Sequence, residues 1–279
     1  MAPEKDWLGL AGKTVVVTGS AGGIGFGIAE CFVSVGASVL LLDRDEAACK
    51  AAVDKLGGAA KKVFGRVCDI SRPEQVKSAA DYLLRVLGPC DVLVNNAGIL
   101  RPGALATLAL EDWQKLLDVN LTGPFLCSQA FGAQMLVKKK GSIVHIASIA
   151  SRFPQSFSGA YSASKAGIVM LSQGLAMEWG PMGIRSNCVS PGNTRSGMTA
   201  PILAVEGVEE RRTAMMPLRR IADPSDMGEV VLFLASDRSA YVTGENISVD
   251  GGYARTILDL LPRPGFAREE VSGPGAARK

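Results

Sequence analysis

The sequence predicts a doubly wound α/β protein, a parallel sheet of about seven strands with helices on both faces. Apolar, β-branched runs alternate along the chain with longer segments of helical period. Several of these runs are apolar at consecutive positions, so both faces of the strands need covering. We expect residues 1–261 to form one domain and residues 262–279, rich in proline and glycine, to form a tail.

The order of the elements follows from the same patterns. Strands are predicted over residues 13–19, 37–43, 61–70, 91–98, 141–148, 184–192 and 246–252. Helices are predicted from the turn after the first strand to about residue 35, and over 45–57, 73–87, 111–138 and 159–179. Residues 193–222 have no clear period, and we interpret them as a flap over a site.

Composition excludes several classes of function. The 30 basic and 27 acidic residues are spread along the 279 positions, without the basic patch that nucleic acid needs. No run reaches the ~18–20 apolar residues of a membrane span, and the start of the chain lacks an apolar signal core. Six cysteines without a CxxC pair and a single histidine, His145 within a strand pattern, argue against a metal site. We therefore expect a soluble, cytoplasmic protein that binds a small molecule.

A glycine-rich turn, TGSAGGIG at 18–25, follows the first strand and opens the first helix. Gly19 allows a tight turn, while Gly23 and Gly25 remove side chains where a pyrophosphate and the sheet approach closely. The N–H groups at the start of the helix would then face the anion. This arrangement is typical of a Rossmann-type dinucleotide site.

An acidic residue, Asp43, ends the second predicted strand, 18 residues after Gly25. Its carboxylate can accept hydrogen bonds from a ribose with free hydroxyls, as in NAD. A 2′-phosphate would meet a like charge, at a cost on the order of 1–4 kcal/mol. NAD is therefore expected and NADP is the less favoured alternative, which Arg44 keeps open because it could turn toward a phosphate.

Further motifs follow in a fixed order along the chain. They are CDIS (68–71), NNAG (95–98), VNLTG (119–123), Ser148, YSASK (161–165), SPGNT (190–194) and VDGG (249–252). Together with the glycine turn they make the chain resemble the classical short-chain dehydrogenase/reductase family over about residues 8–253. The resemblance covers nearly the whole chain.

The resemblance implies two sets of functional residues. The implied catalytic residues are Asn120, Ser148, Tyr161 and Lys165. The implied cofactor-binding residues are Gly19, Gly23, Ile24, Gly25, Asp43, Asp69, Ile70, Asn96, Ala97, Gly98, Tyr161, Lys165, Pro191, Gly192 and Thr194. Asn120 would anchor a water that links Lys165 to solvent, and helices 111–138 and 159–179 would pack against their copies in a homotetramer.

Tyr161 and Lys165 are four residues apart and share one face of the predicted helix. A free tyrosine has a pKa of about 10, and a nearby ammonium together with the positive ring of oxidised nicotinamide should lower it. Tyr161 could then exchange a proton with a substrate hydroxyl while Ser148 stabilises charge on the same oxygen. The sequence therefore predicts an NAD-dependent oxidoreductase that interconverts a secondary alcohol and a ketone.

The sequence defines the substrate less well than it defines the reaction and the cofactor. A polyol, a sugar or another small secondary alcohol is expected. Arg101, Arg152 and Arg195, with Gln155, lie in segments that border the substrate pocket in this family, and arginines bind carboxylates. An anionic substrate is therefore considered. The segments NNAGILRPGA (95–104) and EDWQK (111–115) also resemble dihydrodiol dehydrogenases, so a dihydrodiol dehydrogenase acting on a carboxylated ring is one alternative. A 3-oxoacyl thioester reductase, disfavoured by the NAD preference, and a non-catalytic NAD(H)-sensing regulator are the others.

Overall fold

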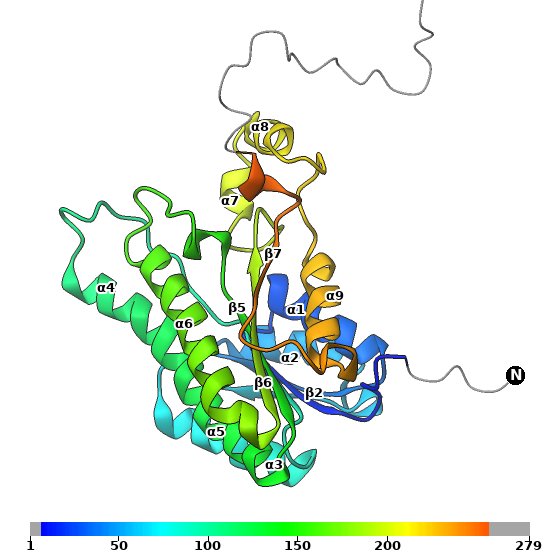
Figure 1. Cartoon of the computed structure of the whole chain (residues 1–279). Helices are drawn as coiled ribbons and strands as arrows, with labels where there is room; N and C mark the ends of the chain where they lie inside the picture. Colours follow the sequence, from blue (N-terminus) through cyan, green and yellow to red (C-terminus); the bar gives the residue numbers. More distant parts are fainter. Residues whose placement is uncertain (1–6, 257–279) are drawn as a thin grey trace, which may run out of the picture.

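The centre of the molecule is a seven-stranded sheet, shown in a computed structural model that describes residues 7–256 (Figure 1). All neighbouring strands run parallel, in the order β3-β2-β1-β4-β5-β6-β7. The strands are β1 Thr14–Thr18, β2 Ser38–Asp43, β3 Val63–Val67, β4 Val92–Asn95, β5 Gly141–Ile146, β6 Ile184–Pro191 and β7 Asn246–Val249. The predicted fold class is confirmed, whereas the predicted tail at 262–279 lies outside the described residues.

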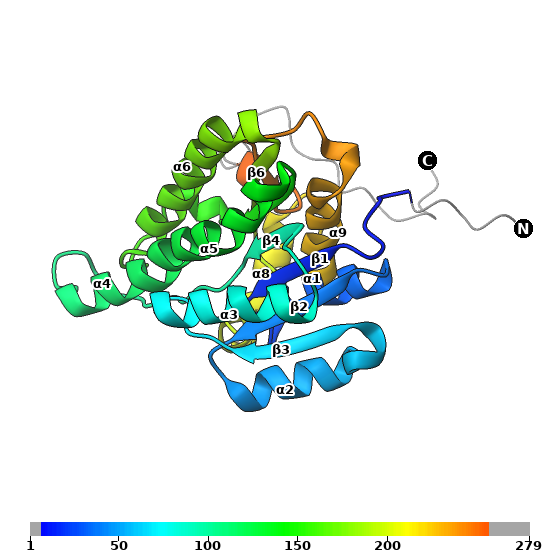
Figure 2. The ribbon, with the colours of Figure 1, turned by 90° about the horizontal axis from the view of Figure 1, so that it is seen from below.

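Helices cover both faces of the sheet (Figure 2). They are α1 Gly23–Ser34, α2 Glu46–Lys55, α3 Pro73–Val86, α4 Leu110–Leu117, α5 Gly123–Lys138, α6 Tyr161–Trp179, α7 Ala200–Leu203, α8 Val208–Met215 and α9 Pro224–Ala235. Side chains of α1, α2 and α9 form one apolar core, and those of α3, α5 and α6 form another on the opposite face. Because two cores enclose it, the sheet is buried on both sides, and all five residues of β1 are buried.

The helix predicted over 111–138 is interrupted. A π-helical turn, Asp118–Thr122, separates α4 from α5 and contains Asn120. Such turns are rare and often occur at functional sites. The interruption places the amide of Asn120 against the backbone of Ile99, a tertiary contact that helical periodicity does not reveal.

Two segments without predicted elements are helical. The flap at 193–222 contains the short helices α7 and α8, and α9 follows it. The start of α9 carries a capping box between Asp223 and Asp226, with Pro224 in its first turn, so the sequence did contain a signal for it. Helix α9 packs tightly on α1, because a Cβ at Gly228 would lie only 2.4 Å from Cys31 Sγ.

The strand order reverses between β1 and β4, which opens a crevice at the carboxyl ends of these strands. The glycine turn follows β1, Asp43 ends β2, and Ser148 lies two residues beyond β5. Helices α7 and α8 lie above the same edge of the sheet (Figure 1). The topology thus gathers the predicted motifs at one edge.

Candidate active site

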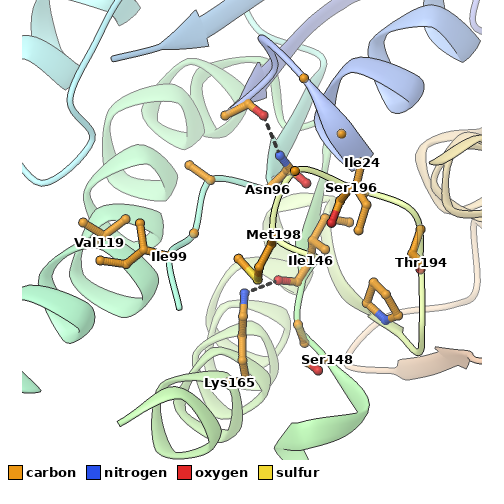
Figure 3. A pocket seen from close by; sticks show the side chains of 18 of the residues that line it. Ile24, Asn96, Ile99, Val119, Ile146, Ser148, Lys165, Thr194, Ser196 and Met198 are labelled. Carbon is orange, nitrogen blue, oxygen red and sulfur yellow. Dashed lines mark hydrogen bonds between the residues drawn. The ribbon is translucent and has the colours of Figure 1, made fainter. Parts of the chain in front are cut away.

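A cavity of about 420 Å³ occupies this edge of the sheet (Figure 3). Of the predicted cofactor-binding residues, all but Gly25 line it: Gly19, Gly23, Ile24, Asp43, Asp69, Ile70, Asn96, Ala97, Gly98, Tyr161, Lys165, Pro191, Gly192 and Thr194. Ser148 lines it as well. Residues at the ends of six of the seven strands, β1 to β6, therefore meet around a single space.

The glycine turn is held by contacts in which a side chain would not fit. Gly19 has a φ of 62°, and a Cβ there would lie 2.7 Å from Ala97 Cα. A Cβ on Gly25 would lie 2.2 Å from the carbonyl oxygen of Gly19, so Gly25 packs behind the turn. On Gly22, in contrast, a Cβ would meet nothing within 4 Å. The turn is thus closed on its protein side and open at Gly22, as a backbone cradle for a phosphate requires.

Hydrogen bonds join this turn to the end of β4. The backbone N–H groups of Asn96 and Ala97 both donate to Thr18 Oγ1 at 3.0 Å. The side-chain amide of Asn96 donates to the carbonyls of Thr18 and Gly19, each at 2.9 Å. Asn96 therefore fixes the turn relative to the sheet, and its amide is committed to protein partners.

Two acidic residues lie on the same side of the cavity. Asp43 accepts a hydrogen bond from Ala21 N at 3.0 Å, so its carboxylate lies beside the glycine turn. For Asp69, burial raises the pKa of the carboxyl, but hydrogen bonds from Ser71 and the charges of nearby arginines more than offset this and lower it. The open turn and the Asp43 carboxylate together fit an adenine dinucleotide.

The predicted catalytic pair is brought together at the start of α6. Lys165 Nζ lies 5.7 Å from the centre of the Tyr161 ring, as expected for residues one helical turn apart. The ammonium donates a 2.8 Å hydrogen bond to the carbonyl of Ile146 (Figure 3). Burial lowers the pKa of Lys165 to about 8, so part of the lysine population is neutral just above physiological pH.

The predicted lowering of the Tyr161 pKa depends on the Lys165 ammonium together with oxidised nicotinamide, and the protein environment alone shifts this pKa the other way. Burial raises the pKa of this phenol, and a hydrogen bond with Ser148 only partly offsets the rise. Lys165 directs its ammonium toward Ile146 O, and its own charge is weakened by burial. Burial therefore acts against phenolate formation at Tyr161.

Asn120 does not line the cavity. It is fully buried, accepts a 2.8 Å hydrogen bond from Ile99 N and donates a 2.9 Å bond to Ile99 O. Its amide also donates to Ser164 Oγ at 3.2 Å, which links it to the helix of Tyr161 and Lys165. In this structure Asn120 joins the π-helical turn, the loop after β4 and α6.

The four predicted substrate residues lie outside the cavity lining. Arg101 is paired with Asp112 at 2.5 Å, and Arg195 is paired with Glu209 and, at 3.8 Å, with Asp223. Arg152 and Gln155 are exposed on the loop between Ser148 and Tyr161. Two of the three arginines are thus already neutralised by carboxylates.

Arg44, which the sequence offered as a possible phosphate contact, also lines the cavity. Other lining residues were not assigned to the site from the sequence. They are Gly22, Cys68, Ile99, Val119, Ile146, Ala147, Ser196, Gly197, Met198 and Thr199. The last four belong to the flap, where Thr199 Oγ1 donates to Thr194 O at 2.7 Å and the hydroxyls of Ser196 and Thr199 are 3.2 Å apart. The Ser-x-x-Thr spacing before α7 resembles a helix start and could have indicated this turn.

The buried polar interior behind the site contains His145. Its ring is fully buried, with Nδ1 3.3 Å from Asn95 Nδ2, and burial lowers its pKa to about 3.

The six cysteines are free and buried. Within residues 7–256 no three His, Cys, Asp or Glu side chains are grouped as a metal site would need. Over the same range no helix combines the length and apolar character of a membrane span.

Fold and site together define a dinucleotide-binding oxidoreductase of the α/β class. The family model described as enoyl-(acyl carrier protein) reductase matches residues 19–254. D-threitol dehydrogenase of Mycolicibacterium smegmatis is 37% identical over 245 residues, covering 88% of this chain and 94% of that protein. The 2,3-dihydro-2,3-dihydroxybenzoate dehydrogenase of Bacillus subtilis is 34% identical over 252 residues, covering 88% and 97%.

A solved structure is similar over the same range. It is a gluconate 5-dehydrogenase from Burkholderia cenocepacia in complex with NADP and tartrate, with a TM-score of 0.85 and 29% identity, covering 90% of this chain and 98% of that one. The chain therefore belongs to the short-chain dehydrogenase/reductase family. It is an enzyme of the alcohol dehydrogenase and ketoreductase type, and its family uses a nicotinamide cofactor.

Proposed function

We propose that this enzyme is an NAD-dependent oxidoreductase that interconverts a secondary alcohol and a ketone, with Tyr161 as the acid–base group. The observation that carries the proposal is the shared cavity. Ser148, Tyr161 and Lys165 line one part of it, and the glycine turn and Asp43 line another. One bound dinucleotide could therefore reach both sets of residues.

Each catalytic side chain has a separate task in this proposal. When bound, a nicotinamide dinucleotide supplies the hydride donor or acceptor and, if oxidised, a positive charge near the phenol. Tyr161 accepts the hydroxyl proton during oxidation and donates it during reduction. Ser148 donates a hydrogen bond to the same substrate oxygen and stabilises the charge that develops there. Because burial alone raises the pKa of Tyr161, deprotonation needs added positive charge in the cavity.

NAD is the proposed cofactor, with NADP as the alternative. The Asp43 carboxylate lies beside the glycine turn, where a 2′-phosphate would meet a like charge. Arg44 also lines the cavity, and the related gluconate 5-dehydrogenase was solved with NADP. The two dinucleotides are therefore to be compared directly.

The related enzymes indicate the range of substrates. A polyol such as D-threitol, a sugar or another small secondary alcohol is the proposed class. The related dihydrodihydroxybenzoate dehydrogenase supports a dihydrodiol dehydrogenase as second candidate, although the pairing of Arg101 with Asp112 leaves this arginine less available for a carboxylate. A 3-oxoacyl thioester reductase is a third candidate. A non-catalytic regulator is disfavoured because Ser148, Tyr161 and Lys165 are all present.

A homotetramer in the cytoplasm is the proposed state of the protein. Exposed apolar side chains on α5 and α6 are Phe125, Val137, Met170 and Met177, which suits packing against a second copy. Six free cysteines suit a reducing compartment. A hydrodynamic mass equal to the 29.2 kDa chain would contradict the tetramer.

The test of the reaction is a spectrophotometric screen with NAD and NADP in parallel. The panel contains polyols, hydroxyacids, dihydrodiols and simple secondary alcohols. We expect Tyr161→Phe to lower kcat/KM by at least about 10³-fold and Ser148→Ala by about 10²-fold, with dinucleotide affinity retained. Unchanged turnover in both variants would show that the assigned roles are wrong.

A further inference from the structure

A second cavity, of about 430 Å³, lies at the opposite edge of the sheet from the active-site cavity. Its lining includes residues at or just before the first positions of β1, β4, β5 and β6. Ile184 begins β6 and lines this cavity, whereas Pro191 ends β6 and lines the active-site cavity. The eight residues of β6 span about 26 Å, so the two cavities are separate sites. We refer to the second as the amino-end cavity.

Positive charge predominates in the amino-end cavity. Its charged lining residues are Lys13, Lys139, Lys140 and Arg185, against Asp91 and Asp237. Both acids are already paired: Asp91 with Lys138, which is not a lining residue, and Asp237 with Lys140 at 3.2 Å. Within residues 7–256, no carboxylate lies at ion-pair distance from the other three lining cations. Three positive charges around the cavity are therefore unpaired.

The ends of three helices explain part of this charge. Helices α5, α6 and α9 all end at this edge, where Lys139, Gly180 and Ala235 line the cavity. Each helix C-terminus carries about half a negative charge, which nearby cations stabilise. Three such ends offset roughly 1.5 of the three unpaired positive charges. An excess of about 1.5 charges remains at the cavity, and it favours an anion.

Arg185 carries a positive charge that the protein holds in place without neutralising it. The guanidinium is half-buried, and Nη1 donates to Leu234 O at 2.8 Å and to Ser239 Oγ at 2.9 Å. Nη2 donates to Ser236 O at 3.0 Å. All of these acceptors are neutral, and burial lowers the pKa of the guanidinium. Charged groups that are removed from water are normally paired with an opposite charge, so this arginine favours an anion nearby.

Lys139 occupies a backbone position that favours glycine. It ends α5 with a φ of 52°, and its N–H donates to Leu136 O at 3.2 Å, while Lys140 N donates to Met135 O at 3.3 Å. Glycine is preferred in this type of helix ending, because a Cβ is strained there. The backbone is closely packed, since a Cβ on Gly183 would lie 2.3 Å from Lys139 O. The lysine is therefore carried on a fixed backbone at a cost in strain.

We propose that the amino-end cavity binds a dianionic phosphate group, carried by a small metabolite, between Lys13 and Lys139. Lysine is a common phosphate ligand, and a dianion gains about twice the Coulomb energy of a monovalent carboxylate from the same cations. The cavity volume lies in the range of small-molecule sites, which leaves room for the carbon skeleton of a phosphate ester. The inference is independent of the reaction proposed above, because the two cavities share no lining residue.

The experiment measures anion binding by calorimetric titration of the whole chain saturated with NADH, at constant ionic strength. NADH fills the glycine turn, where phosphate could also bind. Inorganic phosphate and glycerol 3-phosphate should both bind, and acetate should bind at least ~10-fold more weakly. Tighter binding of glycerol 3-phosphate identifies an ester as the ligand, whereas equal or weaker binding identifies free phosphate. If neither phosphate binds, or if acetate binds as tightly as phosphate, the inference is wrong.

Lysine variants locate the anion. Lys139→Gly removes the ammonium and suits the left-handed backbone, so the fold is retained while phosphate affinity falls about tenfold. Lys62→Gly is the matched control and should keep the full affinity, because Lys62 has a φ of 54°, is exposed and lies outside both cavity linings. Equal affinities in the two variants would show that phosphate binds elsewhere and would overturn the inference, whether or not NADH binds.

Asp237→Asn tests the sign of the charge effect. It removes a like charge from the lining and releases Lys140, so phosphate affinity should rise about threefold; a fall would contradict the inference.

Thermal melts provide a second measure of binding. At a phosphate concentration ten times the parent Kd, the melting temperature should rise by about 3–5 °C in the parent and by about 1 °C in Lys139→Gly. Turnover of alcohols should be unchanged in Lys139→Gly, which lies outside the active-site cavity. Equal rises in the two proteins would overturn the phosphate site alone, whereas absence of turnover in both would contradict only the proposed reaction.

Discussion

The glycine turn and the flap line the same cavity, and they are built in different ways. The turn is fixed by contacts that exclude even one carbon atom, such as the 2.2 Å approach to Gly19 O at Gly25, and by hydrogen bonds to Asn96. The flap is held largely by exposed ion pairs, including Arg195 with Glu209, and by short turns. The glycine turn is therefore specified by tight packing, whereas the flap is specified by side chains that can change at little cost in stability.

The largest expected effect comes from adding a methyl group behind the glycine turn. Gly25→Ala should lower the free energy of unfolding by about 3 kcal/mol and weaken dinucleotide binding at least ~100-fold, because the backbone of Gly19 must shift. Thermal melts and fluorescence titration with NADH measure both quantities. Gly180→Ala is the control: it has open space and helical dihedrals, and should raise stability by about 0.5 kcal/mol. Normal affinity in Gly25→Ala would show that the turn is adaptable.

The second largest effect is expected in the pH dependence of the free energy of unfolding, through the buried His145. The pKa of His145 is about 3 in the folded chain, against about 6.5 when unfolded, so the unfolded state binds more protons between these values. The free energy of unfolding should therefore fall by about 2 kcal/mol from pH 7.5 to 5.0 through this group. Urea titrations at both pH values measure the fall. Because His145 is the only histidine, His145→Asn should remove most of this dependence; an equal fall in the variant would contradict the assignment.

A smaller effect is expected for the charge that borders the glycine turn. Asp43→Asn removes the charge while leaving an oxygen that can accept from Ala21 N. The ratio of kcat/KM for NAD to that for NADP should fall about tenfold, which corresponds to about 1.4 kcal/mol. Asp45→Asn, two residues away and outside the cavity lining, should leave the ratio unchanged. An unaltered ratio in Asp43→Asn would mean that another residue sets the preference.

The smallest effect is expected in the flap. Glu209→Gln removes the carboxylate paired with Arg195, an exposed contact that solvent and salt screen. The melting temperature should stay within ~1 °C of the parent, while KM for the alcohol changes no more than about threefold. A marked loss of melting temperature would indicate that the flap is as firmly built as the glycine turn, and would remove the contrast between the two regions.

Features of the fold that depend on neighbouring residues could be predicted from the sequence, whereas features that depend on distant contacts could not. Local patterns were enough for the seven strands and for the residues that follow them, because apolar runs and glycine turns have near-neighbour causes. The π-helical turn at Asp118–Thr122 was missed, since it depends on the bonds between Asn120 and the distant Ile99. Helix α9 was missed although its capping box was visible in the sequence.

The sequence by itself determined the seven strands in chain order, the glycine turn, Asp43 and the spacing of Tyr161 and Lys165. These depend on periodicity and on residue chemistry that neighbouring positions reveal. Only the tertiary structure decided that Lys165 bonds to Ile146 O, that burial raises the pKa of Tyr161, and that Arg101 and Arg195 are paired with acids. Solvation and charge pairing depend on residues far apart in the chain, so they exist only once the chain has folded.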